Sequence, residues 1–579
     1  MLKNRIQAVS VWAFVFFMML PTGLHAAGNN NIIFKAMHDE MGRSISQLVM
    51  DQFQAPYFMA YTIDDLQGLA IESSLGTLLQ SKLDRTRYLS IDLRVGNAAM
   101  DNSNFKSFQS AFGWRGSRIA IENDYDAIRN TLYLATDREY KEALKSLSKK
   151  SAYLQNRINT ERPNDFIEQP ANRAVDKAEA FNIDRPYFEG LAREATKVFK
   201  EYPMIHVSRL DIHVTVENQY FINSTGSESL RGRCNYTLTL VMSGENADGE
   251  NIQDEDRIIA ENLDDLPKKK ALVSWVRNHA ETMKELISGE TLEEYIGPVI
   301  FSGDAAGEFF RQLFAKNISG LPSPIYENER FARMMPAPAL GSKIKRRVLP
   351  AFMDAYDDPT RTRLGTMDLV GGYEVDDAGN TPQRVQLVEQ GKLVNLPIGT
   401  APTKKVSAPN GHARGALGME VSAQLGNLVF ESSDSVSYDR LRASMLELCQ
   451  DYDMTHGLVI KKLSNPDNRQ PGLAFFFGSA AGGTSSLSLP LEAYKVLPDG
   501  SEVPVPGLEF RNVTVKTLRD ILQTGKKKHV YNYLIGDKQE LPVSIVCPDI
   551  LIEEMELQKV AAEAKAPPVL PSPLLTGDI

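Results

Sequence analysis

The eight histidines are the residues from which a zinc hydrolase could build its site. A zincin places two histidines on one helix face beside a glutamate that activates water, because zinc needs converging neutral imidazoles. The closest pair here, His206 and His213, is seven residues apart in a strand-like segment, where the two side chains are expected to point to opposite faces. We therefore interpret the scattered histidines as surface or core residues and predict no metal site from them.

Other hydrolase and nucleotide-binding motifs are also missing from the sequence. It contains no Gly-x-Ser-x-Gly nucleophile elbow, no Walker loop and no Gly-x-Gly-x-x-Gly. Ser146 and Lys149 have the Ser-x-x-Lys spacing, but their neighbours are charged, as is typical of a solvated helix. The Gly-Gly-Thr-Ser-Ser segment at 482–486 is interpreted as a structural loop, with anion binding as the alternative.

Two acidic segments and three cysteines complete the candidate chemistry. Segments 354–358 and 376–377 offer carboxylates for calcium but lack the regular oxygen spacing of an EF-hand, so we interpret them as solvated turns. Cys234, Cys449 and Cys547 are too few for a disulfide-built scaffold. One pair could bridge in an oxidising compartment, or all three could be isolated thiols.

The N-terminus has the layout of a secretory signal peptide. Lys3 and Arg5 precede an apolar run of about 13 residues, and Ala26 offers a cleavage point. An uncleaved anchor is the alternative, but this run is shorter than the roughly 20 residues that span a bilayer. We expect cleavage after Ala26, an exported mature chain and no membrane span.

Charge and length narrow the class of protein further. The formal net charge is −10, and removing Lys3 and Arg5 with the signal peptide makes it −12. An acidic balance argues against nucleic-acid binding, which needs a basic face. The remaining chain of about 550 residues is too long for one hydrophobic core, so more than one domain is expected.

Hydrophobic periodicity predicts an α+β first half and a β-rich second half. The first half contains helical patterns and alternating, strand-like runs, with a turn expected at Glu217 and Asn218. The second half begins with the strand 299–301 and the helix 305–316, and turn signals then recur at short intervals. The predicted helices are 32–53, 136–158, 187–202 and 266–288, and the predicted strands are 57–63, 69–73, 88–95, 205–216, 220–223 and 236–242. The predicted units are the signal peptide 1–26, an α+β region 27–290, a β-rich domain 291–560 and a Pro-rich tail 561–579, which is either an ordered strap or a free end.

Several stretches of the second half resemble the C-terminal domain of the TldD/TldE family, also called PmbA or "modulator of DNA gyrase". Each is weak alone, but they follow the family's order, and 55–61 and 135–141 resemble the exported branch of the family. The stretches are PVIFSGDAAG at 298–307, YEVDDAGN at 373–380, VEQGKLV at 388–394, NGHAR at 410–414, YKVLPDGSE at 494–502, PGLEF at 506–510 and VSIVCPDILIEE at 543–554.

The resemblance implies a peptidase-like α+β scaffold in which two subunits enclose a cavity where unfolded peptides are cut. Catalytic members carry His-Glu-x-x-x-His on the helix after the first strand of the C-terminal domain, plus a later Cys ligand to zinc, whereas TldE-type members lack this motif. Here Arg311, Gln312 and Lys316 stand at the His, Glu and His positions, and no histidine lies between His279 and His412. Two cations and a glutamine provide neither zinc ligands nor a general base, so no zinc and no catalytic residue are expected.

His412 and Arg414 are the remaining candidates for a binding site, since the Gly-His-x-Arg loop of the family lies toward the cavity. They could hold a peptide carboxylate or carbonyl, or simply brace their loop.

The leading hypothesis is an exported, non-catalytic, TldE-like subunit or peptide-binding protein in the bacterial periplasm or outside the cell. It would form a homodimer, or a heterodimer with a metal-bearing family member. The alternatives are an active peptidase with a rearranged site at His412 or the Asp-rich turns, and an envelope interaction protein.

Overall fold

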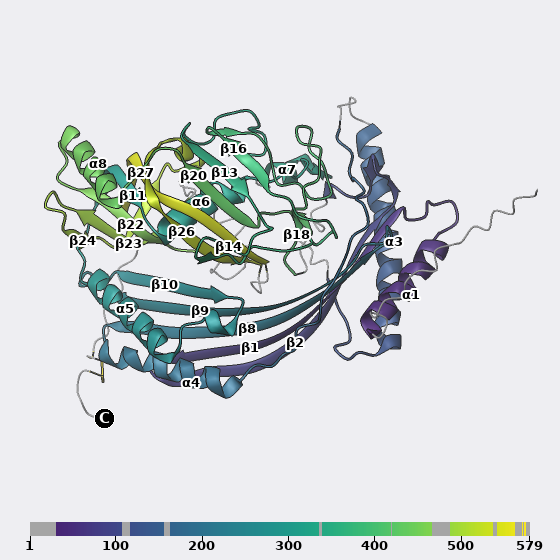
Figure 1. Ribbon diagram of the computed structural model, residues 1–579, viewed down its shortest axis with the longest axis horizontal. Coiled ribbons are helices and arrows are strands. Elements are labelled where there is room, and N and C mark those ends of the chain that lie inside the picture. The colour runs from purple at the N-terminus through teal and green to yellow at the C-terminus, as the bar shows by residue number, and fades with distance from the viewer. Residues whose placement is uncertain are drawn as a thin grey trace, which may run out of the picture.

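The computed structural model of the chain describes residues 31–106, 116–155, 162–334, 338–417, 420–465, 487–536, 541–561, 570 and 572–574. The predicted signal peptide, the loop 482–486 and most of the Pro-rich tail lie outside these residues. Two large sheets form the molecule, and the second lies over the concave face of the first (Figure 1). The predicted α+β class is confirmed. Within the described ranges, no helix is long and apolar enough to cross a membrane.

The first sheet has seven strands in the order β10-β9-β8-β1-β2-β6, with β7 paired to β9. The turn predicted at Glu217 and Asn218 is wrong, because β8 runs through this point without a break. Glu217 pairs with Leu66 of β1 on one side and with Arg233 of β9 on the other, so both neighbours keep this polar segment extended. The strands are β1 (Phe58–Ser74), β2 (Thr77–Arg94), β6 (Ser117–Arg118), β7 (Arg173–Val175), β8 (Ile205–Asn223), β9 (Glu228–Glu245) and β10 (Asn251–Ala260).

Four helices cover the convex face of this sheet (Figure 1). They are α1 (Ile32–Gln47), α3 (Tyr125–Gln155), α4 (Arg185–Thr196) and α5 (Lys269–Ile287). Tyr61 and Ile63 of β1 pack with α1 and α3, whereas Leu69 and Ile71 pack with α4 and α5. These are all odd-numbered positions of one strand, so they share a face, and the even positions point toward the second sheet. The face that meets the second half of the chain is therefore the more polar one, with Thr62, Asp64 and Glu72 on β1.

The second sheet has twelve strands, of which nine follow the order β17-β16-β13-β20-β27-β11-β22-β23-β24. Helix α6 (Asp304–Leu313) packs on one face and α8 (Tyr438–Asp451) on the other, because Val299 and Phe301 of β11 join the α6 core and Ile300 joins the α8 core. The strands are β11 (Glu294–Phe301), β13 (Met353–Asp357), β16 (Val385–Glu389), β17 (Lys392–Leu393), β20 (Asn427–Ser432), β21 (Ser435–Val436), β22 (Gly457–Leu463), β23 (Pro490–Val496), β24 (Glu502–Pro504), β25 (Leu508–Arg511), β26 (Ile521–Ile535) and β27 (Leu541–Lys559). Short pairs join β3 (Gly96–Asn97) to β4 (Met100–Asp101), β5 (Phe105–Lys106) to β12 (Ile325–Tyr326), β14 (Arg363–Leu364) to β15 (Met367–Asp368) and β18 (Ala413–Arg414) to β19 (Ser422–Ala423), and α7 spans Glu329–Met334.

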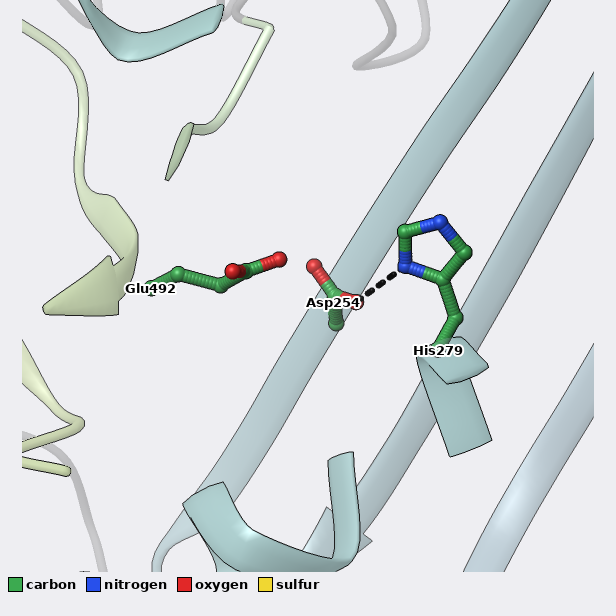
Figure 2. Close-up of side chains that lie close together, drawn as sticks. All are labelled: Asp254, His279 and Glu492. Carbon is green, nitrogen blue, oxygen red and sulfur yellow. Dashed lines mark ion pairs between the residues drawn. The ribbon is translucent and has the colours of Figure 1, made fainter. Parts of the chain in front are cut away.

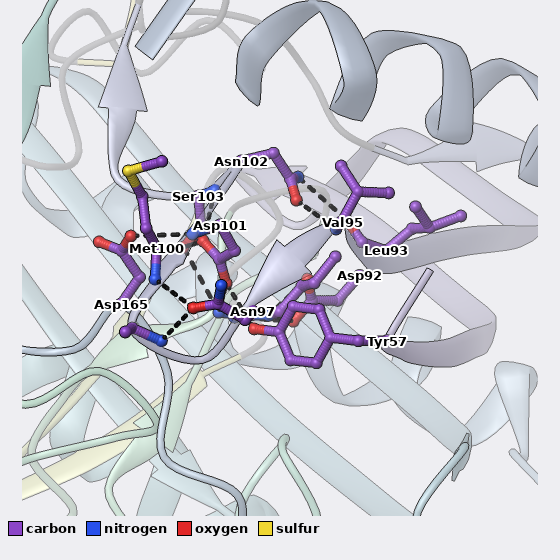
Figure 3. Close-up of polar contacts among 12 residues, drawn as sticks. Tyr57, Asp92, Leu93, Val95, Asn97, Met100, Asp101, Asn102, Ser103 and Asp165 are labelled. Carbon is purple, nitrogen blue, oxygen red and sulfur yellow. Dashed lines mark hydrogen bonds and ion pairs between the residues drawn. The ribbon is translucent and has the colours of Figure 1, made fainter. Parts of the chain in front are cut away.

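A buried polar cluster fixes the loop that follows β2 (Figure 3). The backbone N–H of Asp101 donates to Asp165 Oδ2 at 3.0 Å, and Lys150 Nζ of α3 donates to the same oxygen at 2.6 Å. Tyr57 and Arg94 donate to the Asp101 carboxylate. The loop continues into β5, which pairs with β12, so this cluster holds the far end of the first sheet against the second half of the chain.

Candidate functional site

Helix α6 carries Arg311 and Gln312, two of the three positions that the family resemblance assigns to the zinc motif. It follows β11 directly and packs on the second sheet through Phe309 and Phe310, which are fully buried. Phe310 stacks on Phe430 of β20 with ring centroids 3.9 Å apart. Gly307 allows a close approach to β26, because a Cβ at this position would lie 2.2 Å from the Cβ of Tyr531. The packing therefore fixes where the next turn of the helix presents its side chains.

Arg311 and Gln312 are both bound to one buried carboxylate, Glu308. Arg311 Nε donates to Glu308 Oε2 at 2.6 Å and Arg311 Nη2 donates to Oε1 at 2.7 Å. Gln312 Nε2 donates to Glu308 Oε1 at 2.6 Å and to Ser488 Oγ at 2.7 Å. Arg311 Nη2 also donates to Asn465 Oδ1 at 2.8 Å. The three helix side chains are at most 6% exposed, so they form a buried hydrogen-bonded unit.

This unit does not fit zinc. Both oxygens of Glu308 already accept hydrogen bonds, and the guanidinium of Arg311 is a permanent cation. Lys316 lies exposed in the 3₁₀ turn Ala315–Asn317. Zinc needs three or four neutral or anionic ligands that converge on one point. All three cysteines are free thiols, which is one of the two interpretations offered by the sequence. Helix α6 carries no histidine that could join a cysteine in a zinc ligand set.

A cavity of about 280 Å³ lies between the two sheets beside the start of α6. The first sheet contributes Thr239 of β9 and residues 255–259 of β10 to its wall, and the second half contributes Asp304, residues 462–463, Asn465 and residues 530–533. Because Arg311 binds Asn465, the buried unit on α6 lies directly behind this wall. Each half of the chain supplies only part of the wall, so the cavity depends on how the two halves pack together.

An interdomain charge cluster, formed by Asp254, Asp256, His279, Lys462 and Glu492, adjoins the cavity. Lys462 Nζ of β22 lies 2.9 Å from Asp254 Oδ1 of β10 and also contacts Glu492 of β23. His279 Nε2 of α5 lies 2.6 Å from Asp256 Oδ2, and its Nδ1 lies 3.8 Å from Asp254. Figure 2 shows Asp254 between Glu492 and His279. The cluster therefore joins the first sheet and its helix to the second sheet by charge pairing.

Asp254, His279 and Glu492 form the one group of possible metal ligands in the described part of the chain. The ammonium of Lys462 already binds both carboxylates of this group, in the place a metal ion would take. Burial disfavours the charged imidazole of His279, but Asp254 and Asp256 more than offset it and raise its pKa to about 9. A protonated imidazole is no ligand, so at neutral pH the cluster fits its own cations rather than a metal.

Replacing His279 by glutamine is expected to destabilise the protein in a pH-dependent way. The folded pKa of His279, about 9, lies above its ordinary value, so its stabilising effect is fully present below about pH 6.5 and is lost as pH rises through about 9. His279→Gln should therefore cost about 3 kcal/mol near pH 6 and little above about pH 10, as measured by urea unfolding across this range. His38→Gln, at a half-exposed pair with Glu228, is the control and should cost less than about 1 kcal/mol. Equal losses for His279→Gln at both pH values would contradict the assignment.

His412 and Arg414 lie away from the cavity and are fully buried. The two ring nitrogens of His412 lie 2.9 Å from the carbonyl of Asn410 and from Asp357 Oδ2. Arg414 donates to the backbone carbonyls of Leu425 and Pro542. Both ring nitrogens of His412 and both terminal nitrogens of Arg414 are therefore used within the chain, and Arg414 Nε is buried without a partner among the described residues. Since both side chains are fully buried, the geometry favours the loop-bracing alternative over peptide binding.

The two acidic segments are not the solvated turns that we expected. Asp357, Asp358, Asp376 and Asp377 are all buried. Asp376 accepts hydrogen bonds from backbone amides of its own turn, including that of Asn380, and burial raises its pKa to about 6. Asp377 accepts from Arg231 of β9 at 2.9 Å and so joins the two halves. The segment 376–377 lies in a turn, as predicted, but residues 354–357 belong to strand β13 and not to a turn. Packing of both segments against other parts of the chain is what buries these carboxylates.

Sequence patterns do not single out the residues that line the cavity. Asp304 stands within the family-like stretch 298–307, which is the one signal that could have drawn attention to it. Lys462 follows another lysine in an otherwise apolar strand, and nothing in its neighbours distinguishes it from Lys461. The proximity of Lys462 to β10, about 200 residues earlier, is a property of the tertiary structure alone.

Comparisons with known proteins agree with this architecture. The sequence model of the PmbA/TldA metallopeptidase C-terminal domain matches residues 294–559. A search of curated proteins finds no match.

Solved structures provide the other comparison. A proposed modulator of a DNA gyrase from Thermotoga maritima is 13% identical, with 90% of this chain and 99% of that chain covered and a TM-score of 0.57. TldE from Thermococcus kodakarensis is also 13% identical, with 90% and 100% covered and a TM-score of 0.55. A proposed modulator of DNA gyrase from Bacteroides thetaiotaomicron is 11% identical, with 91% and 99% covered and a TM-score of 0.54. At these identities the structures show a shared fold, and the domain match identifies residues 294–559 as a PmbA/TldA metallopeptidase C-terminal domain, which confirms the predicted resemblance to the TldD/TldE (PmbA) family.

Proposed function

We propose that this protein is an exported, non-catalytic subunit of the TldE type, which holds unfolded peptides in the cavity beside α6. It would work as a homodimer or together with a metal-bearing family member that performs the cleavage. Export is part of the proposal because of the signal-like segment 1–26. The observation that carries the proposal is the buried unit in which Arg311 and Gln312 bind Glu308. The family resemblance assigns Arg311 and Gln312 to two of the three positions of the zinc motif.

A peptide-binding role is supported by the nature of the cavity wall. The cavity combines apolar, aromatic and charged side chains from both halves of the chain, as ligand pockets commonly do. Its volume of about 280 Å³ is close to the lower end of the range for ligand pockets, roughly 300 Å³ upward, and suits a side chain or short segment better than a folded partner.

The alternative of an active peptidase with a rearranged site receives less support. Its candidate groups were His412 and the Asp-rich turns. Both ring nitrogens of His412 and the carboxylates of Asp376 and Asp377 already bind partners within the chain. A general base must reach the proton that it abstracts, and His412, Asp357, Asp358, Asp376 and Asp377 are at most 6% exposed.

Metal content and proteolysis of the purified mature chain test the proposal. We expect a molecular mass that corresponds to a chain starting at Ala27. We also expect no stoichiometric zinc and no cleavage of casein, with or without chelator. Cleavage should begin when a metal-bearing family member is added, and chelator should abolish it. Stoichiometric zinc together with chelator-sensitive cleavage by the chain alone would overturn the proposal, whereas an inactive pair would point to the third hypothesis, an envelope interaction protein.

A further inference from the structure

Asp304 is the first residue of α6, and its side chain is exposed and lines the cavity. The neighbouring Gly303 N–H donates to Asp549 Oδ1 at 3.1 Å, so another carboxylate already satisfies this end of the helix. Asp304 itself makes no hydrogen bond or ion pair with any side chain or backbone group that the structure describes. Its charge is thus available to a group that enters the cavity.

The other charged groups of the wall already have partners. Glu255 accepts from the backbone N–H of Asn465 at 2.8 Å, and Asp256 binds His279. Lys462 is bound by Asp254 and Glu492. The wall therefore contains three carboxylates against two cations, Arg257 and Lys462, and Lys462 is already neutralised. The local charge favours a positive occupant and disfavours an anion.

We propose that the cavity binds a primary ammonium group of a peptide, at the carboxylate of Asp304. This deepens the proposed function by naming the kind of peptide that the site selects. The ammonium would come from a lysine side chain or from a free N-terminus, and both present the same chemistry to the carboxylate. A metal ion is a poorer occupant, because Asp304 would be a single ligand and the nearby Asp254 and Glu492 are held by Lys462.

The surroundings of Asp304 in the cavity should make its binding of an ammonium depend on pH. Burial in the cavity and the charges of Asp256 and Glu492 raise its pKa to about 6, against the opposing charges of Lys462 and His529. Asp304 therefore loses its proton between about pH 5 and pH 7, and an ammonium that binds the carboxylate should bind more tightly as pH rises through this range.

Binding of labelled, unfolded Gly-Ser peptides to the full mature chain tests this inference. One peptide contains lysines, a second has glutamine in their place and a third has glutamate. The lysine peptide should bind roughly ten- to hundredfold more tightly than the glutamine peptide, the range expected for one charge-assisted hydrogen bond in a shielded site. Asp304→Asn should remove this preference and also the rise in affinity between about pH 5 and pH 7.

Asp439→Asn is the matched control, because Asp439 is an exposed acid in the first turn of α8, away from the cavity. It should leave binding unchanged. Acetylating the N-terminus, or replacing lysine by norleucine, tells which ammonium is bound. If Asp304→Asn fails to fold, the pH profile of the unmodified chain and the ranking of the three peptides still decide the question. Equal binding of all three peptides that is also unchanged by acetylation of their N-termini would overturn this inference alone, whereas no binding of any peptide would overturn the proposed function as well.

Discussion

Replacing Glu308 by alanine is expected to lower the free energy of unfolding by about 3–5 kcal/mol, because Arg311 would remain buried without a counter-charge. Gln312 would lose an acceptor in the same step, so two helix side chains would be left with unmet donors. Urea unfolding of the variant and the parent, followed by circular dichroism, measures the difference.

A double variant separates the ion pair from the shape of the helix. Glu308→Leu with Arg311→Met removes both charges and keeps the volume, and we expect it to be clearly more stable than Glu308→Ala. Equal losses for the single and double variants would mean that the pairing contributes nothing and that packing alone holds this turn of α6. The outcome bears on function, since this ion pair is what makes the position unsuitable for zinc.

Replacing Lys462 by methionine is expected to cost a similar amount, about 3–5 kcal/mol, by leaving the carboxylates of Asp254 and Glu492 together without their shared cation. Since Lys462 belongs to the second half and Asp254 to the first, the variant should also loosen the contact between the two sheets. Urea unfolding gives the change in stability, and hydrogen exchange of β10 gives the change in the contact.

Lys461→Met provides the matched control for this prediction. Lys461 is the preceding residue of the same strand, and its side chain is 39% exposed beside Glu502. An exposed ion pair contributes at most about 1 kcal/mol, so this variant should lose little stability. If both variants lost the same small amount, the interdomain charge cluster would not be a stabilising contact.

The sequence by itself determined the class of fold and the state of the zinc motif. Residues at helical spacing, such as Ile33, Met37 and Met41, predicted α1 because a helix buries one stripe of side chains. The stretches from 298 to 554 identified the family, and Arg311 and Gln312 showed that the motif is missing. These conclusions depend on residue type and local spacing, which the sequence contains in full.

Only the tertiary structure decided what surrounds those residues. Glu217 and Asn218 look like a turn, yet they are extended because two neighbouring strands continue past them. Asp377 belongs to a turn, yet it is buried because Arg231 of β9 packs against it. The cavity and the pairing of Lys462 likewise require both halves of the chain to meet. Burial and electrostatics at such points arise from contacts between residues far apart in sequence, and the local spacing of residue types does not predict these contacts.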